Sequence, residues 1–283
     1  MKILVSGGTG FLGSKVVNSF LNKGHEITVL YRDNNKIIDQ NNRNPYYLKY
    51  IEINNENNLK DYDAIFYCAT NYSYIKGGII ELLDANLILP LELLKIANKN
   101  SIKYFINIDT IIDKNVNEYS TSKSSLRYWI KKFDGSINIV NIRIDHFFGP
   151  GDKSFKFINN IIISLLNNKK SIDLTSGDQE RSFIYIDDVV NAISLIIENL
   201  DNQNSYKEYN ISGKESYSIK YIVERIKYLI NNNTTQLLWG KLPYRENETF
   251  KTKCNLSEIN SIGWKQDTDL DSGLKKTINY YKK

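Results

Sequence analysis

Short apolar runs alternate with longer amphipathic segments through the first half of the chain. The apolar runs are rich in Ile, Val, Leu, Phe and Tyr, and they predict strands at Lys2–Ser6, Glu26–Tyr31, Tyr47–Ile53, Ala64–Ala69, Lys103–Ile108 and Ile137–Arg143. Between them, apolar residues three and four positions apart predict helices at Phe11–Asn22, Glu81–Asn98 and Asn117–Lys132. Strands that alternate with helices predict an α/β fold of the Rossmann type, a doubly wound parallel sheet with helices on both faces.

The pattern becomes less regular after Gly149-Pro150-Gly151. Helices are predicted at Phe155–Leu166, Asp187–Glu198, Ile219–Ile230 and Asp269–Tyr281. Short strands are predicted at Ser171–Leu174 and Phe183–Ile186. We therefore expect a Rossmann domain over residues 1–150 and a smaller C-terminal α/β substrate lobe over residues 151–283, interleaved with the last elements of the Rossmann sheet.

Composition narrows the classes of partner and compartment. The 283 residues carry a formal net charge of +5, and basic residues are mixed with acidic ones, which argues against a nucleic-acid partner. Cys68 and Cys254 are far apart in the sequence and are expected to be free thiols in a reducing compartment. No apolar stretch has the length of a membrane span or a signal peptide, so we expect a cytoplasmic protein. Two isolated histidines and two distant cysteines predict no metal site.

The strongest single motif is Gly7-Gly8-Thr9-Gly10-Phe11-Leu12-Gly13, between the first predicted strand and the first predicted helix. Glycines at this place allow a tight turn, a close approach of the backbone to a pyrophosphate, and close packing of helix on strand. The free N–H groups at the start of the helix bind the anion. The motif therefore predicts a dinucleotide site. Its expected cofactor-binding residues are Gly7, Thr9, Gly10, Phe11, Leu12 and Gly13.

Arg32 and Asp33, later in the chain, concern the choice between NAD and NADP. The residue that ends the second strand of this fold meets the adenosine ribose, where a carboxylate selects NAD and an arginine accepts the 2′-phosphate of NADP. Arg32 stands at this place and favours NADP(H), because a guanidinium binds phosphate through paired hydrogen bonds. Asp33 follows and keeps NAD(H) as the alternative, and a solvated loop charge is the other interpretation of Arg32. Glu52, at the third strand, could accept a hydrogen bond from the adenine amino group.

A tyrosine and a lysine four residues apart, Tyr119 and Lys123, lie on one face of a predicted helix. A free tyrosine has a pKa near ~10 and exchanges protons poorly at neutral pH. A neighbouring ammonium stabilises the phenolate, so the sequence predicts a lowered pKa for Tyr119 and a general acid/base role. Thr110 ends the preceding strand, where ligands of open α/β sheets bind. These three residues are the predicted catalytic group.

These motifs resemble those of the extended short-chain dehydrogenase/reductase superfamily, and within it the nucleotide-sugar branch of NAD-dependent epimerases and dehydratases. The likeness extends along essentially the whole chain. Besides the glycine turn and the Tyr119/Lys123 pair, it includes Ala64–Ala69, Asn86, Arg143–Gly151, Arg181–Asp188, Leu242–Arg245, Ile262–Trp264 and Ser272–Leu274.

The resemblance implies a role for each matching position. Tyr119 would donate or accept the proton, Lys123 would bind the nicotinamide ribose and tune Tyr119, and Thr110 would hold the reacting oxygen. Ala69 would border the cofactor. The positions that bind the nucleotide sugar in relatives are occupied by His146, Arg181 and Arg245. Guanidinium groups suit a diphosphate, whereas a histidine that packs in the fold or faces solvent is an equal alternative at position 146.

Departures from the family pattern narrow the reaction. Ile111 and Ile112 follow Thr110 where 4,6-dehydratases carry an Asp-Glu pair, and aliphatic side chains cannot transfer protons. Neither Cys68 nor Cys254 lies near Thr110 in the sequence, which argues against epimerase-reductases that use a cysteine and a histidine. The chain most resembles 4-ketoreductases such as the CDP-abequose and CDP-paratose synthases of bacterial surface-polysaccharide biosynthesis. The resemblance implies NADPH-dependent reduction of the C4 ketone of a nucleotide-linked 4-keto deoxysugar. An NAD-dependent nucleotide-sugar 4-epimerase and a non-catalytic NADP-binding regulatory protein are the alternatives.

The resemblance also implies a homodimer. Relatives commonly pair through the helix that carries the Tyr/Lys motif and the helix before it. The apolar residues that could form this face, or could pack on the sheet instead, are Leu82, Leu89, Leu93, Leu126, Trp129 and Ile130.

Overall fold

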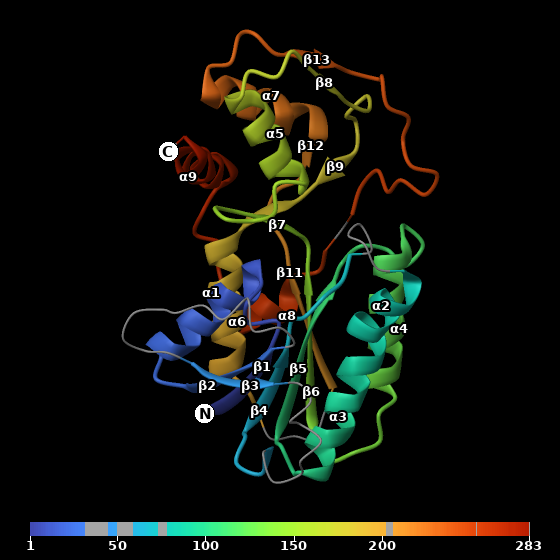
Figure 1. Ribbon diagram of the computed structural model, residues 1–283, viewed down its shortest axis with the longest axis vertical. Coiled ribbons are helices and arrows are strands. Elements are labelled where there is room, and N and C mark those ends of the chain that lie inside the picture. Colours follow the sequence, from blue (N-terminus) through green and yellow to red (C-terminus); the bar gives the residue numbers. More distant parts are fainter. Residues whose placement is uncertain (32–44, 50–58, 73–77, 202–205, 253, 283) are drawn as a thin grey trace.

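The computed structural model describes residues 1–31, 45–49, 59–72, 78–201, 206–252 and 254–282. A parallel sheet with helices on both sides forms the lower part of the molecule in Figure 1, and a smaller lobe lies above it. In the described part of the chain the sheet has seven strands in the order β11-β6-β5-β4-β1-β2-β3. Their bounds are β1 (Lys2–Ser6), β2 (Glu26–Tyr31), β3 (Tyr46–Lys49), β4 (Ala64–Tyr67), β5 (Tyr104–Thr110), β6 (Asn138–Ile144) and β11 (Tyr206–Ile211).

Every neighbouring pair in this sheet is parallel. The inner strands are continuous apolar runs because both of their faces are covered; Ile3, Leu4 and Val5 of β1 are fully buried. The carboxyl ends of parallel strands meet at one edge of the sheet, and this is where open α/β sheets bind ligands. The register pairs Thr110 of β5 with Ile144 of β6 at this edge.

Helices cover both faces of the sheet (Figure 1). One face carries α1 (Phe11–Asn22) and α6 (Ile186–Glu198), which are joined by a hydrogen bond of 2.8 Å between the hydroxyls of Ser19 and Ser194. The other face carries α2 (Ile79–Leu83), a π-helical turn (Asp84–Ile88), α3 (Leu89–Lys99) and α4 (Glu118–Lys131). Each face has its own buried apolar cluster. The predicted doubly wound α/β fold is confirmed.

The smaller lobe is built from segments that follow β6. Its helices are α5 (Phe157–Leu166), α7 (Ile219–Ile230) and α9 (Leu270–Tyr281). Its strands form the pairs β7 (His146–Phe148) with β10 (Phe183–Tyr185), β9 (Glu180–Arg181) with β12 (Tyr217–Ser218), and β8 (Ser171–Asp173) with β13 (Gln236–Leu238). The chain returns to the main sheet at α6 and again at β11, and the short α8 (Ser257–Ser261) contacts β11.

Several elements differ from the sequence pattern. The short strands β7, β9, β12 and β13 and the short helix α8 are not predicted. The edge strand β11 is not predicted, because Lys207 and Glu208 interrupt its apolar alternation and an edge strand needs few buried side chains. The helix predicted over 81–98 is split by the π-helical turn. Of the strand predicted at 47–53, the structure has β3 ending at Lys49, and residues 50–53 lie outside the described residues.

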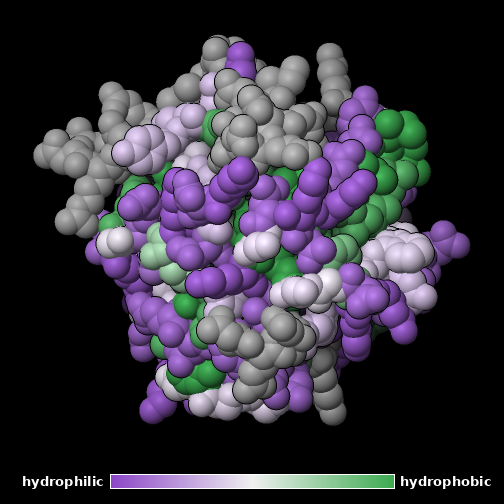
Figure 2. All heavy atoms as spheres, turned by 90° about the horizontal axis from the view of Figure 1, so that it is seen from below, coloured by the Kyte–Doolittle hydropathy of each residue, from purple (hydrophilic) through white to green (hydrophobic). Residues whose placement is uncertain are grey.

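Figure 2 shows the lower end of the molecule, where hydrophilic side chains dominate. A group of hydrophobic residues lies at the right-hand edge of this view, which is the side of α2–α4 in Figure 1. Most of the apolar residues predicted for a dimer face are instead buried in the fold: Leu82, Leu89, Leu93, Leu126 and Ile130. Trp129 is exposed.

Of the helices that the structure describes, none has the length and apolar character needed to cross a membrane.

Candidate active site

The turn between β1 and α1 leaves no room for side chains at two of its glycines. Gly7 has a φ of +82°, and a Cβ atom there would lie 2.5 Å from the backbone nitrogen of Ala69. A Cβ atom at Gly13 would lie 2.1 Å from the carbonyl oxygen of Gly7. Gly10 is the N-cap of α1, and no described side chain caps this helix. The turn therefore fits the diphosphate of a dinucleotide, which the backbone can approach closely and the first N–H groups of α1 can bind.

The remaining predicted cofactor residues are placed around this turn or outside the described residues. Thr9 is half-buried and Leu12 is buried. The Phe11 ring stacks on the Phe147 ring, with centroids 6.1 Å apart, so the start of α1 lies beside β7, where the sheet meets the smaller lobe. The other two residues, Arg32 and Glu52, lie outside the described residues.

Thr110, Tyr119 and Lys123 lie together where β5 ends and α4 begins. Thr110 is 4% exposed and Lys123 is 2% exposed. The Asn117 side chain caps α4 by accepting a hydrogen bond of 2.9 Å from the Ser120 N–H, which fixes the first turn of the helix. The Tyr119 side chain, in this first turn, forms a hydrogen bond with the Thr110 side chain. The structure thus brings together the three residues predicted as the catalytic group.

Burial dominates the proton affinity of this group. Desolvation raises the pKa of Tyr119 well above its usual value, the neighbouring Tyr72 and Asp109 raise it further, and the hydrogen bond with Thr110 opposes them. The prediction of a lowered pKa for Tyr119 is therefore wrong for this structure. Burial also lowers the pKa of Lys123, against the opposing charge of Asp109. Tyr119 is consequently a phenol at neutral pH, the form that donates a proton.

Two residues that the sequence pattern does not single out complete the surroundings of Tyr119. Tyr72, in the loop after β4, packs against the Tyr119 ring with centroids 4.7 Å apart, and the two side chains form a hydrogen bond. Lys156, the N-cap of α5, places its ammonium 3.5 Å from the centroid of the Tyr72 ring. These residues are far apart in the sequence and belong to no motif, so only the fold reveals their contact.

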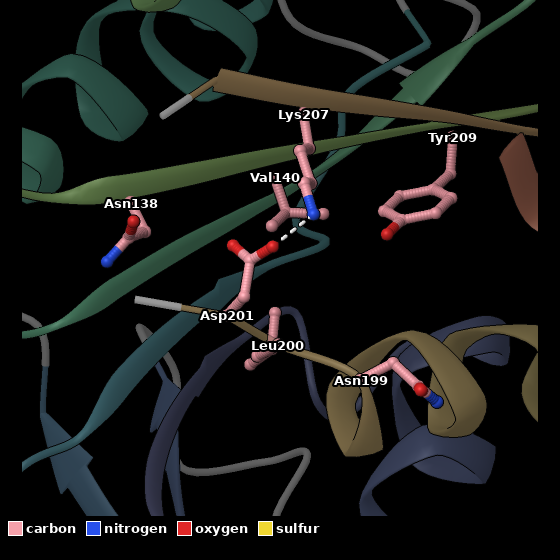
Figure 3. Close-up of a pocket in the computed structure, with 7 residues that line it drawn as sticks. All are labelled: Asn138, Val140, Asn199, Leu200, Asp201, Lys207 and Tyr209. Atoms are coloured by element: carbon pink, nitrogen blue, oxygen red, sulfur yellow. Dashed lines mark hydrogen bonds and ion pairs between the residues drawn. The ribbon is translucent and has the colours of Figure 1, made fainter. Parts of the chain in front are cut away.

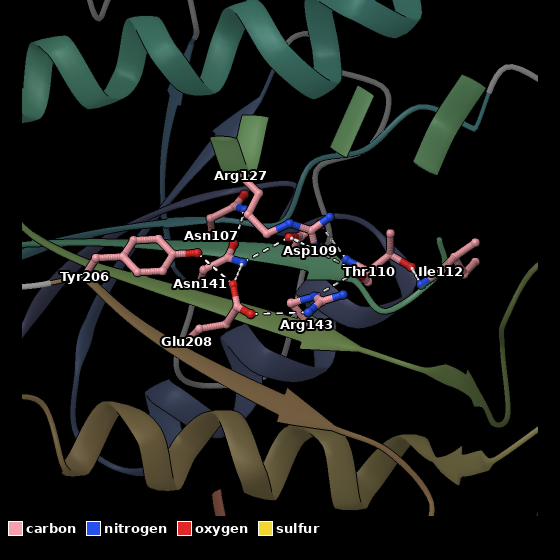
Figure 4. Close-up of polar contacts among 9 residues, drawn as sticks. All are labelled: Asn107, Asp109, Thr110, Ile112, Arg127, Asn141, Arg143, Tyr206 and Glu208. Carbon is pink, nitrogen blue, oxygen red and sulfur yellow. Dashed lines mark hydrogen bonds and ion pairs between the residues drawn. The ribbon is translucent and has the colours of Figure 1, made fainter. Parts of the chain in front are cut away.

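A buried polar network lies beside Thr110 (Figure 4). The Asp109 carboxylate is fully buried, pairs with the Arg127 guanidinium at 3.1 Å and accepts a hydrogen bond of 3.0 Å from Asn141. The carbonyl of Thr110 accepts hydrogen bonds from Arg127 at 3.4 Å and from Arg143 at 3.3 Å. The network therefore fixes the end of β5 from α4 on one side and from β6 on the other.

The π-helical turn positions the loop that carries Tyr72. Asn86, within this turn, is fully buried. Its side chain accepts from the Asn71 N–H at 2.9 Å, and donates to the Asn71 carbonyl at 2.8 Å and to the Ser122 hydroxyl at 3.0 Å. Asn86 thus fastens the loop after β4 to α4, which holds Tyr72 and Tyr119 side by side.

A pocket at the opposite end of the sheet is too small to be a ligand site (Figure 3). It is lined by Asn138, Val140, Asn199, Leu200, Asp201, Lys207 and Tyr209. Lys207 and Asp201 form an ion pair within it. Its volume of about 10 Å³ is that of a single water molecule at most.

Comparison with known proteins gives a consistent result. Residues 3–212 match the model of the NAD dependent epimerase/dehydratase family. The chain belongs to this family. CDP-abequose synthase of Salmonella typhimurium is 29% identical to it, over 98% of this chain and 97% of that protein. A putative UDP-glucose 4-epimerase of Methanocaldococcus jannaschii is 23% identical, over 99% and 98%. The crystal structure of UDP-glucose 4-epimerase from Thermotoga maritima shares the fold, with a TM-score of 0.84 and 22% identity over 99% of this chain and 98% of that one.

These findings confirm the resemblance drawn from the motifs: the chain is an extended short-chain dehydrogenase/reductase of the nucleotide-sugar branch.

His146 stands at the junction of the sheet and the smaller lobe. Its Nδ1 lies 2.6 Å from the Asp145 carboxylate, which also accepts a hydrogen bond of 2.8 Å from Ser212. Burial would raise the pKa of Asp145, but the contacts with His146 and Ser212 outweigh it and lower that pKa. The ring of His146 is therefore oriented by a buried carboxylate.

The two arginines predicted to bind diphosphate are linked through one loop. The Arg181 guanidinium forms an ion pair with Glu248 and donates a hydrogen bond of 2.6 Å to the Thr249 carbonyl. Arg245, three residues before Glu248, is exposed, and its carbonyl accepts from the Glu248 N–H at 3.1 Å. Arg181 thus holds the loop that carries Arg245 against β9.

Proposed function

We propose that this protein is an NADPH-dependent oxidoreductase that reduces the C4 ketone of a nucleotide-linked 4-keto deoxysugar in bacterial surface-polysaccharide biosynthesis. The observation that carries the proposal is the hydrogen bond between Thr110 and a protonated Tyr119, beside the buried Lys123. These residues lie at the edge of the sheet that also carries the glycine turn. The 29% identity to a CDP-abequose synthase along 98% of the chain supports the substrate class.

The residues of the chain divide the work of binding and proton transfer. A bound nicotinamide dinucleotide would supply the hydride for the ketone carbon. The glycine turn would bind its diphosphate, and Lys123 its ribose. Thr110 and Tyr119 would donate hydrogen bonds to the carbonyl oxygen and stabilise the negative charge that develops there. Tyr119 would then transfer its proton to that oxygen, which gives an alcohol and a phenolate that solvent re-protonates.

The protonation state of Tyr119 favours reduction over epimerisation. A 4-epimerase must first remove a proton from a sugar hydroxyl, which requires the phenolate, whereas a ketoreductase begins with the phenol. Desolvation keeps Tyr119 in the phenol form. An NAD-dependent 4-epimerase is the second candidate, because the chain is 23% identical to a putative UDP-glucose 4-epimerase over 99% of its length.

We base the choice of NADP(H) on Arg32, which follows β2 at the position that meets the adenosine ribose. NAD(H) is the alternative, since proteins of similar fold have been solved in complex with NAD. For the sugar nucleotide we propose His146, Arg181 and Arg245 as ligands. Arg181 would exchange its contact with Glu248 for the diphosphate, because a dianion offers a guanidinium more charge than one carboxylate.

We propose further that the protein is a homodimer that pairs through the helical layer of α2–α4. A group of hydrophobic residues lies at the upper right edge of Figure 2, on the side of this layer. Large apolar side chains remain exposed on the layer. They are Ile79, Ile80, Ile88, Tyr128 and Trp129. Such a concentration of exposed apolar side chains is typical of an interaction surface.

The decisive experiment follows NADPH and NADH oxidation at 340 nm with a panel of CDP-, dTDP-, GDP- and UDP-linked 4-keto sugars. Oxidation of NADPH by one of them supports the ketoreductase and identifies the nucleotide. If no keto sugar consumes either coenzyme, while the protein interconverts 4-hydroxyl epimers in the presence of NAD, the epimerase is correct. If neither reaction occurs although NADPH binds, the protein is a non-catalytic binder.

A further inference from the structure

Three side chains from three separate elements form one continuous contact: Tyr119 of α4, Tyr72 of the loop after β4, and Lys156 at the start of α5. The two tyrosine rings lie 4.7 Å apart and their side chains are hydrogen-bonded. The Lys156 ammonium lies 3.5 Å from the centre of the Tyr72 ring. The family roles given to Thr110, Tyr119 and Lys123 do not account for Tyr72 or Lys156.

Proton donation by Tyr119, as in the proposed function, leaves a phenolate in a desolvated site. Desolvation disfavours that charge, and Lys123 is itself buried with a lowered pKa. Further stabilisation of the phenolate would lower the barrier to proton transfer, and it must come from groups already in contact with Tyr119.

We infer that Tyr72 is a positioning residue that donates a hydrogen bond to the Tyr119 phenolate as it forms, and that Lys156 supplies the positive charge that strengthens this donation. The inference rests on the proposed role of Tyr119 as the proton donor. The Tyr72 hydroxyl both accepts and donates, so the group that accepts from the phenol can rotate and donate to the phenolate. A cation over a ring face is attracted to its π electrons and polarises the ring, which makes the phenolic O–H a stronger donor.

The two contacts could instead be simple packing, and conservative variants separate these roles. Tyr72→Phe keeps the stacked ring and removes the hydroxyl. Lys156→Met keeps the length of the side chain and removes the charge. Both variants should reduce kcat with NADPH and the nucleotide-linked 4-keto sugar that the panel identifies by about tenfold or more, because hydrogen bonds to charged groups are the strong ones. The KM values of both substrates should change by less than about twofold, since neither group is assigned to substrate binding.

The pH profile gives a readout that packing would not change. Burial lowers the pKa of Lys156 to about 8, Lys153 adds to the lowering, and Asp152 opposes it. The activity of the unchanged protein should therefore fall as pH rises through about 8. Lys156→Arg, which stays charged, should restore kcat and move this fall to higher pH. Asp152 also raises the pKa of Tyr72, as does Cys68, and Asp109 raises the pKa of Tyr119.

Lys153→Met is the matched control, because Lys153 is exposed and its ammonium faces the Phe155 ring instead. At neutral pH its kcat should equal that of the unchanged protein. The fall in its activity should move only slightly to higher pH, because Lys153 adds to the lowering of the Lys156 pKa. If Tyr72→Phe and Lys156→Met keep the kcat and the pH profile of the unchanged protein while Tyr119→Phe is inactive, the inference is wrong and the proposed function stands. If Tyr119→Phe itself remains active, the proposed function fails first.

Discussion

Every polar group of the Thr110 backbone is engaged in the structure. Its N–H donates to the Asp109 carboxylate at 2.7 Å, and its carbonyl accepts from Arg127 and Arg143. The Thr110 hydroxyl itself accepts a hydrogen bond of 3.2 Å from the Ile112 N–H and is hydrogen-bonded to Tyr119, so its position is also fixed. A hydrogen-bond donor that is already in place needs no reorganisation when charge develops on the substrate. Thr110 is thus a proposed donor whose orientation is set by the fold.

Removal of the Tyr119 hydroxyl tests the proton-donor role directly. Tyr119→Phe should lower kcat by about 10²–10⁴-fold, the usual contribution of a general acid. The coenzyme should bind with unchanged affinity, because the glycine turn lies on β1 and α1 and does not depend on the hydroxyl. Stopped-flow hydride transfer and coenzyme fluorescence titration separate the two effects. Turnover within tenfold of the unchanged protein would refute the assignment.

The Asp109–Arg127 pair is expected to contribute strongly to stability. The Asp109 side chain is fully buried and Arg127 is largely so, and removing one partner leaves an uncompensated charge in the interior. Asp109→Asn should lower the free energy of unfolding by roughly 3 kcal/mol, measured by urea denaturation. Asp61→Asn, an exposed site, is the control and should change it by less than about 0.5 kcal/mol. A loss below about 1 kcal/mol at Asp109 would show that the pair is weakly coupled to folding.

The residues found from the sequence are those whose geometry is local. Tyr119 and Lys123 are four residues apart on one helix, and this spacing alone places them on one face. Tyr72 and Lys156 meet only because a π-helical turn and the smaller lobe bring them together. The pKa of Tyr119 could not be predicted either, because its desolvation depends on tertiary packing rather than on its neighbours in the sequence.

The helix α4 is the element that organises the site. Tyr119, Lys123 and Arg127 recur at intervals of four residues along it, so one face carries the proposed proton donor, its neighbouring cation and the partner of Asp109. The rotation of this face is set at the first turn, where the Asn117 side chain and the Ser120 side chain form a reciprocal capping box.

Loss of the cap should therefore affect both stability and catalysis. Asn117→Ala should lower the free energy of unfolding by about 1 kcal/mol, and should reduce kcat several-fold because the turn that carries Tyr119 loosens. Asn115→Ala, an exposed residue two positions earlier, is the control for the substitution itself. Denaturation curves and steady-state rates of both variants make the test; equal behaviour of the two would mean that packing alone fixes α4.

Helices and strands were predictable where apolar residues recur at a regular spacing without interruption. The helix Phe11–Asn22 and the strand Lys2–Ser6 have the predicted bounds. The strand β11 was not predictable because it lies at the edge of the sheet and pairs with only one neighbour, β6. Few of its side chains are buried, so its sequence shows only a weak alternation of polar and apolar residues. The π-helical turn leaves no trace in the spacing of apolar residues. It contains the buried Asn86, whose hydrogen bonds reach Asn71 and Ser122 on other elements.

At the scale of the whole molecule, the site is completed by segments that follow β6. β7 continues from β6 and pairs with β10, and Phe147 of β7 stacks on Phe11 at the start of α1. Lys156 and His146 come from the same part of the chain. Residues proposed to bind the dinucleotide and residues proposed to bind the sugar nucleotide thus meet across a contact of aromatic rings, which buries apolar surface between sheet and lobe.

The proposed homodimer follows from the large apolar side chains that the helical layer of α2–α4 keeps in solvent. Ile80 and Trp129 are 63% and 54% exposed. Their helices, α2 and α4, contact each other, and α4 also packs on β5 and β6. A second copy of the chain would bury the two side chains by a two-fold contact. Light scattering after size exclusion should give twice the mass of 32.8 kDa. Introducing charge by Ile80→Lys with Trp129→Glu should give the monomer, whereas Tyr228→Glu, an exposed aromatic of α7, should leave the dimer intact. A monomer at micromolar concentration before any substitution would refute this interface.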